Sequence, residues 1–308
     1  MSRAISPEFL YDLKVGVLAR LTKLIQRDDT LLLALRGDSV NVYYRGGSIL
    51  KLTRSKGTTY SAFFHPNFLK GSAAIPPPPV IADESDCRAW VEAIPRLKEV
   101  MNSFFVDHPK SEREFQQLVA WENNRSAISN DTEYFITDIE FADREQGSRI
   151  DMLGLKWRSK DRKDATRCVP VLIEMKYGIG AFDGSAGIVK HIEDLNVILS
   201  SQEKKSELDL IISEQFTQLD DLGLLRFNRN KVFTRVDVDG KPEVILLLAN
   251  HNPRSSRLLE VLRPIKNPSN YDLRFFVSSF AGYGMHDACM LTLDEFKAHL
   301  ERYPSKNA

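Results

Sequence analysis

The chain is poor in cysteine, has no long apolar run and carries no excess charge of either sign. Its three cysteines, Cys87, Cys168 and Cys289, include no Cys-x-x-Cys pair, which argues against a disulfide framework and against a structural zinc site. No segment approaches the roughly 18 uncharged apolar residues of a membrane-spanning helix, and the N-terminal residues 1–8 contain no apolar signal core. We therefore expect a cytoplasmic protein without membrane association.

Balanced charge excludes one class of partner and leaves another open. Lysine and arginine together number 42, as do aspartate and glutamate, so the formal net charge is zero. This argues against a histone-like or polybasic protein, but it permits a local basic groove because fields depend on where charge lies. The 308 residues suit one large domain or two modest ones of roughly 150 residues each.

The four consecutive prolines of residues 76–79 predict a stiff linker, since such a run excludes helix and central strand. We place a domain boundary there, with an N-terminal α+β domain over residues 1–82 and a second domain over residues 83–308. Apolar residues at helical spacing predict a helix over residues 9–25. Turn signals separate three short strands over residues 31–35, 39–44 and 48–53. This first domain is expected to bind substrate or a partner.

The second domain alternates strands with helices. Patterns predict a helix over residues 84–105 interrupted near Pro95, and another over residues 111–125. Further strands are expected at 134–141, 149–157, 169–176, 244–249 and 273–280, and further helices at 188–199, 208–222 and 254–262. The first three of these strands can meander by hairpins, whereas the later ones need helical crossovers. The predicted fold class is α/β (α+β), a mixed central sheet flanked by helices.

Charged residues that interrupt two apolar strands indicate a candidate catalytic site. Asp151 interrupts one strand, and Glu174 and Lys176 end the next. The two-residue period places Glu174 and Lys176 on one face, and Asp151 can lie beside Glu174 if the strands form a hairpin. Two facing carboxylates repel unless a cation lies between them, and Mg²⁺ takes such oxygen ligands. Lys176 could then orient or deprotonate a water, or offset charge at phosphate; a structural salt-bridge cluster is the alternative.

The pattern Asp…Glu-x-Lys on a strand hairpin between helices resembles the PD-(D/E)XK nuclease superfamily, over residues 111–280 approximately. The resemblance implies a restriction-endonuclease-like core and a phosphodiesterase that depends on Mg²⁺ or Mn²⁺. It implies an active centre of Asp151, Glu174 and Lys176, with the main-chain carbonyl of Met175 as a further metal ligand. DNA is the substrate that it implies.

Many members of that superfamily add a glutamate from the preceding helix. Glu112 and Glu114 both qualify here. We favour Glu112, with Gln116 beside it at the edge of the face that meets the sheet, because Ser111 and Glu114 have the spacing of a capping box. The choice between the two glutamates stays open.

The helix after Lys176 lacks the Gln or Gln-x-x-x-Tyr pattern of some related nucleases, which argues against their exonuclease branch. It has His191 and Asp194 instead, one turn apart. These two could hold a phosphate or orient a water, or they could form a solvated helix face. The glycine-rich residues 178–187 match no nucleotide-binding fingerprint and favour a flexible loop.

Two stretches carry local positive charge that could attract nucleic acid. Residues 156–167 hold six basic residues, of which Lys156 and Arg158 are assigned to substrate binding, and residues 36–56 combine five basic residues with Tyr43 and Tyr44. Basic and aromatic side chains together suit a nucleic-acid backbone and its bases. A solvated charged loop is the alternative for each stretch.

The expected function is a metal-dependent nuclease, a magnesium-dependent deoxyribonuclease, with nucleic acid as its partner. A homodimer is also compatible with the sequence. The first alternative is a catalytically inactive nuclease-fold module that binds nucleic acid or a protein. The second is a structural or regulatory protein that uses the N-terminal hairpins as an interaction surface.

Overall fold

The structure is a computed structural model that describes residues 3–55, 57–142, 149–163, 166–178, 187–228, 235–250, 256–278 and 284–302. The chain forms two compact units. Unit 1 comprises residues 1–121 and 214–226, and unit 2 comprises residues 122–213 and 227–308. Helices α4 (Ser111–Asn124) and α6 (Gln202–Asp221) each contribute to both units, so the chain passes between the units more than once.

Helices and strands are mixed in both units. The described residues form eight α-helices and two sheets, one antiparallel and one mixed, which confirms the α+β class. Among these residues no helix has the length and apolar character needed to cross a membrane.

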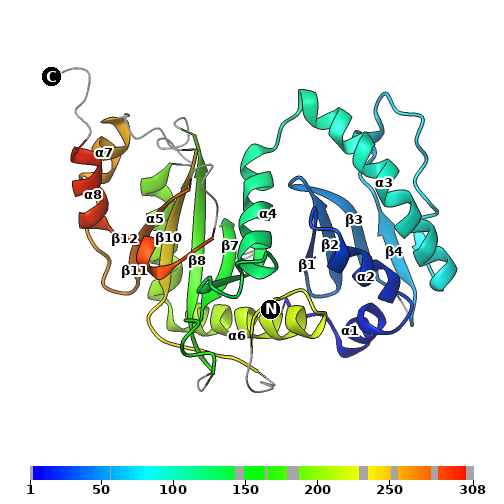
Figure 1. Cartoon of the computed structure of the whole chain (residues 1–308), viewed down its shortest axis with the longest axis horizontal. Coiled ribbons are helices and arrows are strands. Elements are labelled where there is room, and N and C mark those ends of the chain that lie inside the picture. The colour runs from blue at the N-terminus through cyan, green and yellow to red at the C-terminus, as the bar shows by residue number, and fades with distance from the viewer. Residues whose placement is uncertain are drawn as a thin grey trace. The chain divides into compact units, whose positions relative to one another are not determined.

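Unit 1 is built on an antiparallel sheet in the order β1-β2-β3-β4-β5 (Figure 1). Its strands are β1 (Leu31–Leu35), β2 (Ser39–Tyr44), β3 (Gly47–Arg54), β4 (Tyr60–Phe63) and β5 (Val80–Ile81). Its helices are α1 (Pro7–Lys14), α2 (Ala19–Arg27), the 3₁₀ turn η1 (Pro66–Leu69) and α3 (Glu84–Asp107). Helix α2 packs on α3 and β1, and α3 packs on β3 and β5.

The helix expected over residues 9–25 is two helices, α1 and α2, separated near Gly16. A Cβ at Gly16 would collide with the side chain and backbone of Asp12. The Asp12 carboxylate is buried and accepts a 2.6 Å hydrogen bond from the Tyr60 hydroxyl. A glycine lets the chain pass this buried pair, which periodicity alone does not reveal.

The proline run lies inside unit 1, so the observed division differs from the expected boundary after residue 82. Strand β5 follows the prolines and pairs with β4, and the carbonyl of Pro79 accepts from the Ala62 amide. Trp90 Nε1 on α3 donates to the carbonyl of Pro78 at 3.0 Å. Prolines donate no backbone hydrogen bond and therefore suit the approach to an edge strand. Helix α3 also continues through Pro95, where we expected an interruption.

Residues 214–226 also belong to unit 1, although they are distant in sequence from residues 1–121. The Gln218 side chain accepts from the Ile5 amide at 2.9 Å and donates to the Ile5 carbonyl at 2.7 Å. Gln215 Nε2 donates to the Leu35 carbonyl at 3.2 Å. These bonds join the second half of α6 to the N-terminal segment.

Unit 2 contains a seven-stranded mixed sheet in the order β12-β11-β10-β8-β7-β6, with β9 paired to β8. Its strands are β6 (Tyr134–Ala142), β7 (Arg149–Lys156), β8 (Arg167–Tyr177), β9 (Asp237–Val238), β10 (Glu243–Ala249), β11 (Asp272–Ser278) and β12 (Leu291–Thr292). Its own helices are α5 (Ile188–Ser200), α7 (Ser256–Leu262), the 3₁₀ turn η2 (Asp287–Cys289) and α8 (Leu293–Glu301).

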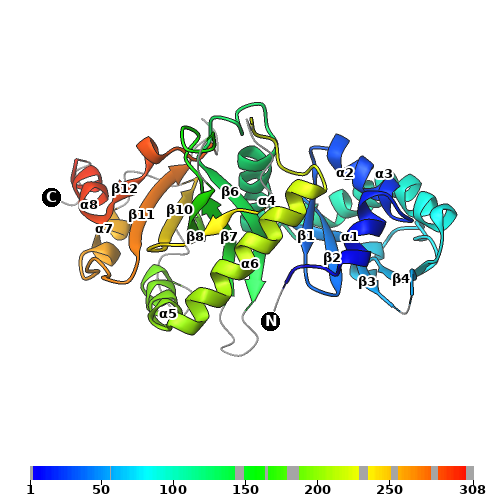
Figure 2. The ribbon, with the colours of Figure 1, turned by 90° about the horizontal axis from the view of Figure 1, so that it is seen from below.

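The sheet of unit 2 follows the predicted connections. Strands β6, β7 and β8 pair antiparallel, whereas β10 is parallel to β8 and β11 is parallel to β10. Every residue of β10 is buried, as expected for a central strand covered on both faces. Helix α5 lies beside the sheet near β8 and β10 (Figure 2), and the rings of Phe275 and Phe296 stack at 4.8 Å between β11 and α8.

Candidate active site

The sheet of unit 2 opens between β7 and β8. Their ladder ends with the pair Met152 and Ile173, yet β7 continues beside β6 and β8 continues beside β10. The next residues in register are Asp151 and Glu174, which therefore face each other across the opening on one side of the sheet. This opening is where the sequence pattern placed its carboxylate pair.

At the opening, the side chain of Asp151 accepts a hydrogen bond from β8 beyond the last backbone pair of the β7–β8 ladder. Its carboxylate Oδ2 accepts a 2.8 Å hydrogen bond from the Met175 amide, and the residue is only 8% exposed. The amide and the carbonyl of one strand residue point toward the same neighbouring strand. The Met175 carbonyl therefore faces β7 as its amide does, beyond the last ladder pair.

Glu174 lies deeper and uses its two carboxylate oxygens unequally. Oε1 accepts from Lys176 Nζ at 3.1 Å and lies 2.9 Å from His191 Nδ1. Oε2 is buried and has no hydrogen-bond partner among the described residues. A buried carboxylate oxygen without a donor is costly, so this atom is a candidate point of contact for a ligand.

Two nitrogen groups reach the carboxylate from different elements. Lys176 is two residues beyond Glu174 on β8, and its side chain is 5% exposed. His191 lies in the first turn of α5, and its side chain is 21% exposed. Asp194 does not join them, since its carboxylate pairs with Lys190 on the exposed side of the helix. Of the predicted pair His191 and Asp194, only the histidine reaches the site.

The site fits a divalent cation in its ligand chemistry. Asp151, Glu174 and the carbonyl of Met175 are hard oxygen donors, which is what Mg²⁺ and Mn²⁺ prefer. The buried Glu174 Oε2 has no hydrogen bond within the described part of the chain, and a cation would satisfy it. No group of three or more His, Cys, Asp or Glu side chains with metal-binding arrangement occurs among the described residues, so any cation here needs the carbonyl or water as well.

The predicted residues of α4 belong to unit 1. Helix α4 begins at Ser111, so Ser111 is its first residue and not its N-cap. Glu114 accepts from Arg45 Nε at 2.8 Å, whereas Glu112 is half-buried. Gln116 is fully buried, and neither atom of its amide has a hydrogen-bond partner among the described residues.

Lys156 lies in a buried network and not on an open loop. Its side chain is 9% exposed at the end of β7, with Nζ 3.1 Å from Glu243 Oε2 and in contact with Asp287. Tyr134 donates to the other oxygen of Glu243 at 2.6 Å. Arg158 remains half-exposed, 3.6 Å from Asp287 Oδ2. We expected Lys156 to bind substrate. In the structure its ammonium group already contacts two carboxylates and is therefore not available to a substrate phosphate.

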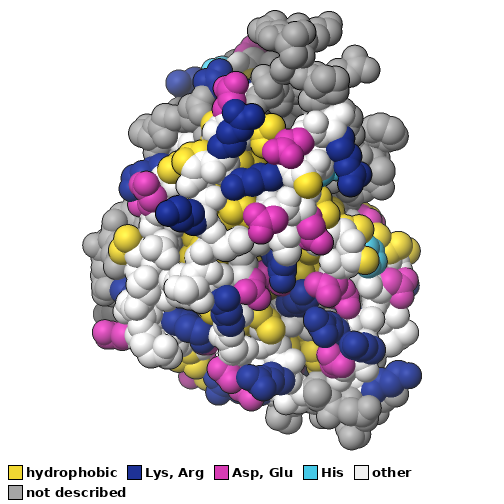
Figure 3. Space-filling model, turned by 90° about the vertical axis from the view of Figure 1, so that its left-hand side faces the viewer, with side chains coloured by type: hydrophobic (Ala, Val, Ile, Leu, Met, Phe, Trp, Pro, Cys, Tyr) yellow, Lys and Arg dark blue, Asp and Glu magenta, His cyan; other side chains and the backbone are white. Residues whose placement is uncertain are grey.

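The second basic stretch also differs from the expected surface. Tyr43 and Tyr44 are each 9% exposed, and the Tyr44 hydroxyl donates to Asn102 Oδ1 at 2.9 Å. Their rings are packed within unit 1 and are closed to stacking by a base. On the side of unit 2 that carries α7 and α8, Lys and Arg side chains alternate with Asp and Glu among the described residues (Figure 3).

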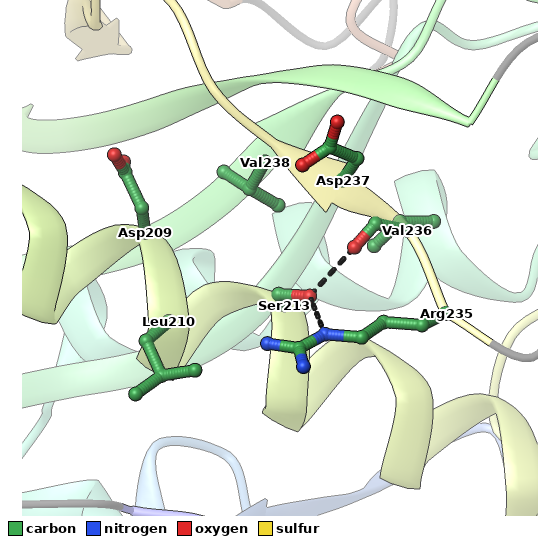
Figure 4. A pocket seen from close by; sticks show the side chains of 7 residues that line it. All are labelled: Asp209, Leu210, Ser213, Arg235, Val236, Asp237 and Val238. Atoms are coloured by element: carbon green, nitrogen blue, oxygen red, sulfur yellow. Dashed lines mark hydrogen bonds between the residues drawn. The ribbon is translucent and has the colours of Figure 1, made fainter.

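Unit 2 has a separate cavity of about 430 Å³ that the sequence did not indicate (Figure 4). It is lined by Asp209, Leu210, Ser213, Arg235, Val236, Asp237 and Val238. Ser213 Oγ donates to the Val236 carbonyl at 2.7 Å and accepts from Arg235 Nε at 3.2 Å, which orients the guanidinium. Burial raises the pKa of Asp209. None of Asp151, Glu174, Lys176 and His191 lines this cavity.

No protein-family model, no curated protein and no solved structure matches this chain. The opening between β7 and β8 is therefore the feature of this chain that bears most directly on function. That geometry brings together two carboxylates, a main-chain carbonyl, an ammonium group and an imidazole.

Proposed function

We propose that this chain is a metal-dependent nuclease of the PD-(D/E)XK type, which hydrolyses phosphodiester bonds of nucleic acid, with DNA as the expected substrate. The observation that supports it most is the opening between β7 and β8. Asp151 and Glu174 face each other there, Lys176 lies on the same face, and Glu174 Oε2 is buried without a partner among the described residues.

A purely structural ion pair explains this arrangement less well. Lys176 and His191 both approach Oε1 of Glu174, which leaves the buried Oε2 without a hydrogen bond among the described residues. A stabilising buried ion pair needs its remaining lone pairs satisfied by hydrogen bonds. A catalytic or ligand-binding role is one explanation of a buried polar atom without a hydrogen-bond partner.

Asp151, Glu174 and the Met175 carbonyl would hold the cation, Mg²⁺ or Mn²⁺. Bound there, it would supply Lewis-acid stabilisation of the negative charge that develops on the phosphoryl oxygens.

The remaining groups of the site manage protons and charge. Hydrolysis adds a water oxygen to phosphorus and releases an alcohol oxygen, so the water must lose a proton and the leaving oxygen must gain one. Lys176 offsets negative charge at the phosphate and orients the water. A neutral His191 that donates from Nδ1 to Glu174 keeps Nε2 as a proton acceptor. Both residues therefore suit a role in the chemical step.

The order of elements adds support. The antiparallel strands β6, β7 and β8 are followed by α5 and by β10, which is parallel to β8. This succession agrees with the element order on which the resemblance to PD-(D/E)XK nucleases depends.

An inactive nuclease-fold module that binds nucleic acid or a protein is the second candidate. The observation that favours it is the direct contact of Lys176 with Glu174, since an ammonium group engaged by a carboxylate is less free to act on water. The two candidates differ in one measurable property, which is turnover in the presence of a metal.

The test compares the purified full-length chain with three variants on plasmid and oligonucleotide substrates, in Mg²⁺, in Mn²⁺ and in EDTA. Lys176→Ala should lower the cleavage rate by roughly 10²- to 10³-fold, the range for removing one group that stabilises developing negative charge, while Mn²⁺ affinity measured by calorimetry changes little. Glu174→Gln should lose both, because a carboxylate is a ligand and an ammonium group is not. Lys266→Ala changes an exposed lysine of unit 2 that lies outside both basic stretches and is the matched control.

Wild-type protein that binds nucleic acid but never cleaves it would favour the inactive module. Unchanged cleavage by a well-folded Lys176→Ala protein would reject the catalytic role of the lysine. Cleavage that persists in EDTA would reject the dependence on metal.

A further inference from the structure

Unit 1 contains a cavity of about 640 Å³ along α3, which we call the α3 pocket. Six residues of α3 and its C-cap line one wall, at the spacing of a single helical stripe: Arg96, Glu99, Val100, Ser103, Phe104, Asp107 and His108. The opposite wall is formed by η1 and the loop after it, residues 67–68 and 70–73. A volume of this size suits one small ligand or one residue of a larger one.

Two parallel rings form the end of this pocket. The imidazole of His108 lies over the ring of Phe104, with centroids 4.3 Å apart and planes 10° apart. Phe104 is fixed in turn by edge-on contacts with Phe68, at 5.0 Å and 88°, and with Phe105, at 6.0 Å and 71°. Since His108 is exposed, the stack ends in a flat ring that a third ring can continue.

The polar groups of the pocket suit both parts of a nucleotide. Lys70 and Asp107 are exposed and line the pocket, and neither side chain makes a hydrogen bond or an ion pair within the described part of the chain. An ammonium group binds a phosphate, and a carboxylate accepts from the exocyclic amine of a base. Arg96 and Glu99 neutralise each other at 2.7 Å. A single aromatic side chain of a protein could stack on His108, but it would provide no partner for the charges of Lys70 and Asp107.

We propose that the α3 pocket holds one nucleotide of a single-stranded nucleic acid, with its base stacked on His108, its phosphate near Lys70 and its edge near Asp107. The choice of nucleic acid over another stacked ring rests on the proposed nuclease function. The role of the pocket is separate from cleavage: it anchors an unpaired stretch of the substrate on unit 1.

Binding is measured by fluorescence anisotropy of the full-length chain at one salt concentration, in EDTA so that no cleavage interferes. The probes are a labelled 12-nucleotide deoxyadenylate strand and an abasic strand of the same length, which has the same phosphates but no bases. His108→Ala should weaken binding of the deoxyadenylate strand roughly 5- to 150-fold, which corresponds to about 1–3 kcal/mol per stacked base, and should hardly change binding of the abasic strand. His108→Tyr should restore most of the affinity, because it returns a stacking ring.

Two further variants separate stacking from charge and from helix integrity. Lys70→Ala should weaken both strands alike and reduce the salt dependence by about 0.7, the slope of one phosphate contact on a single strand. Val106→Ala alters an 80% exposed residue of the same helix end outside the pocket and should leave both affinities unchanged.

Equal affinity of the wild type for the two strands would overturn the proposal, as would equal losses from His108→Ala and Val106→Ala. Displacement of the strand by adenosine monophosphate at similar affinity would reject a strand in favour of a free nucleotide. Absence of binding to any strand would also overturn it. The nuclease proposal fails on a different result, the absence of metal-dependent cleavage, so the two failures are distinguishable.

Discussion

Lys156 is a buried lysine that contacts two carboxylates, and the loss of its charge should destabilise unit 2. Its ammonium group lies in a network with the Glu243 and Asp287 carboxylates and 5.3 Å from the ring of Tyr134. Replacement by methionine keeps the apolar stem and removes the charge. The Glu243 side chain, 6% exposed, would then retain the Tyr134 hydroxyl but lose its cation.

The size of the effect follows from burial. Removing one partner of a buried ion pair costs about 3–5 kcal/mol, because it leaves an uncompensated charge. For a unit of 150–250 residues, 1 kcal/mol shifts Tm by about 2–4 °C. We therefore expect Lys156→Met to lower the Tm of unit 2 by roughly 6–20 °C, whereas a lysine that only contacts substrate would leave Tm unchanged.

Scanning calorimetry without metal or nucleic acid measures this shift, and Lys160→Met is the control for loss of an exposed lysine. The double variant Lys156→Met with Glu243→Gln should recover part of the loss, since it removes the stranded charge, with a coupling of about 1–3 kcal/mol. A shift below 2 °C, or strictly additive effects of the two substitutions, would refute the reasoning. Weaker nucleic-acid binding at unchanged Tm would restore the role that the sequence suggested.

Two further outcomes test the packing and the acid stability of unit 2. Burial alone would raise the pKa of Asp287, but the hydrogen bond and the charge of Lys156 hold this pKa below its ordinary value of 3.8. The ionised Asp287 therefore stabilises the folded state above pH 3.8. This contribution is lost as the pH falls through the lower pKa of the folded state. Asp287→Asn should make urea stability lower at neutral pH and less dependent on pH below about 3.8, and an unchanged acid limb would contradict this. Gly154→Ala should lower the urea midpoint, with a cost of about 1–3 kcal/mol for overpacking. The added Cβ would collide with the Phe135 carbonyl across the β6–β7 ladder. An unaltered midpoint would contradict this and show that β6 can shift to accommodate the methyl group.

The sequence predicted those elements whose cause is local. The two-residue period of β8 placed Glu174 and Lys176 on one face. Asp151 was expected beside Glu174 on the condition that the two strands form a hairpin, and β7 and β8 are antiparallel neighbours. The continuous apolar run of β10 identified a buried strand. Period and run length depend only on adjacent residues, so both are readable without the fold.

The rest depends on partners that are distant in sequence. Lys156 appeared to belong to a basic loop because Glu243, the residue that buries it, lies 87 positions away. His108 was not noticed because its partner Phe104 matters only once η1 fixes that ring. Strand β5 was missed because two residues after four prolines carry no period. The site residues on two consecutive strands could be predicted as a group. His191 was also a candidate from the sequence, but its contact with Glu174 depends on how α5 packs against these strands.

The division of the chain also has a consequence for biosynthesis. Unit 1 includes residues 214–226, and Gln218 alone makes two hydrogen bonds to Ile5. These contacts can form only after residues 214–226 have been synthesised, by which time strands β7 and β8 of unit 2 have been synthesised as well. A fragment that ends at residue 121 would lack these contacts, so unit 1 completes its packing only after part of unit 2 has been made.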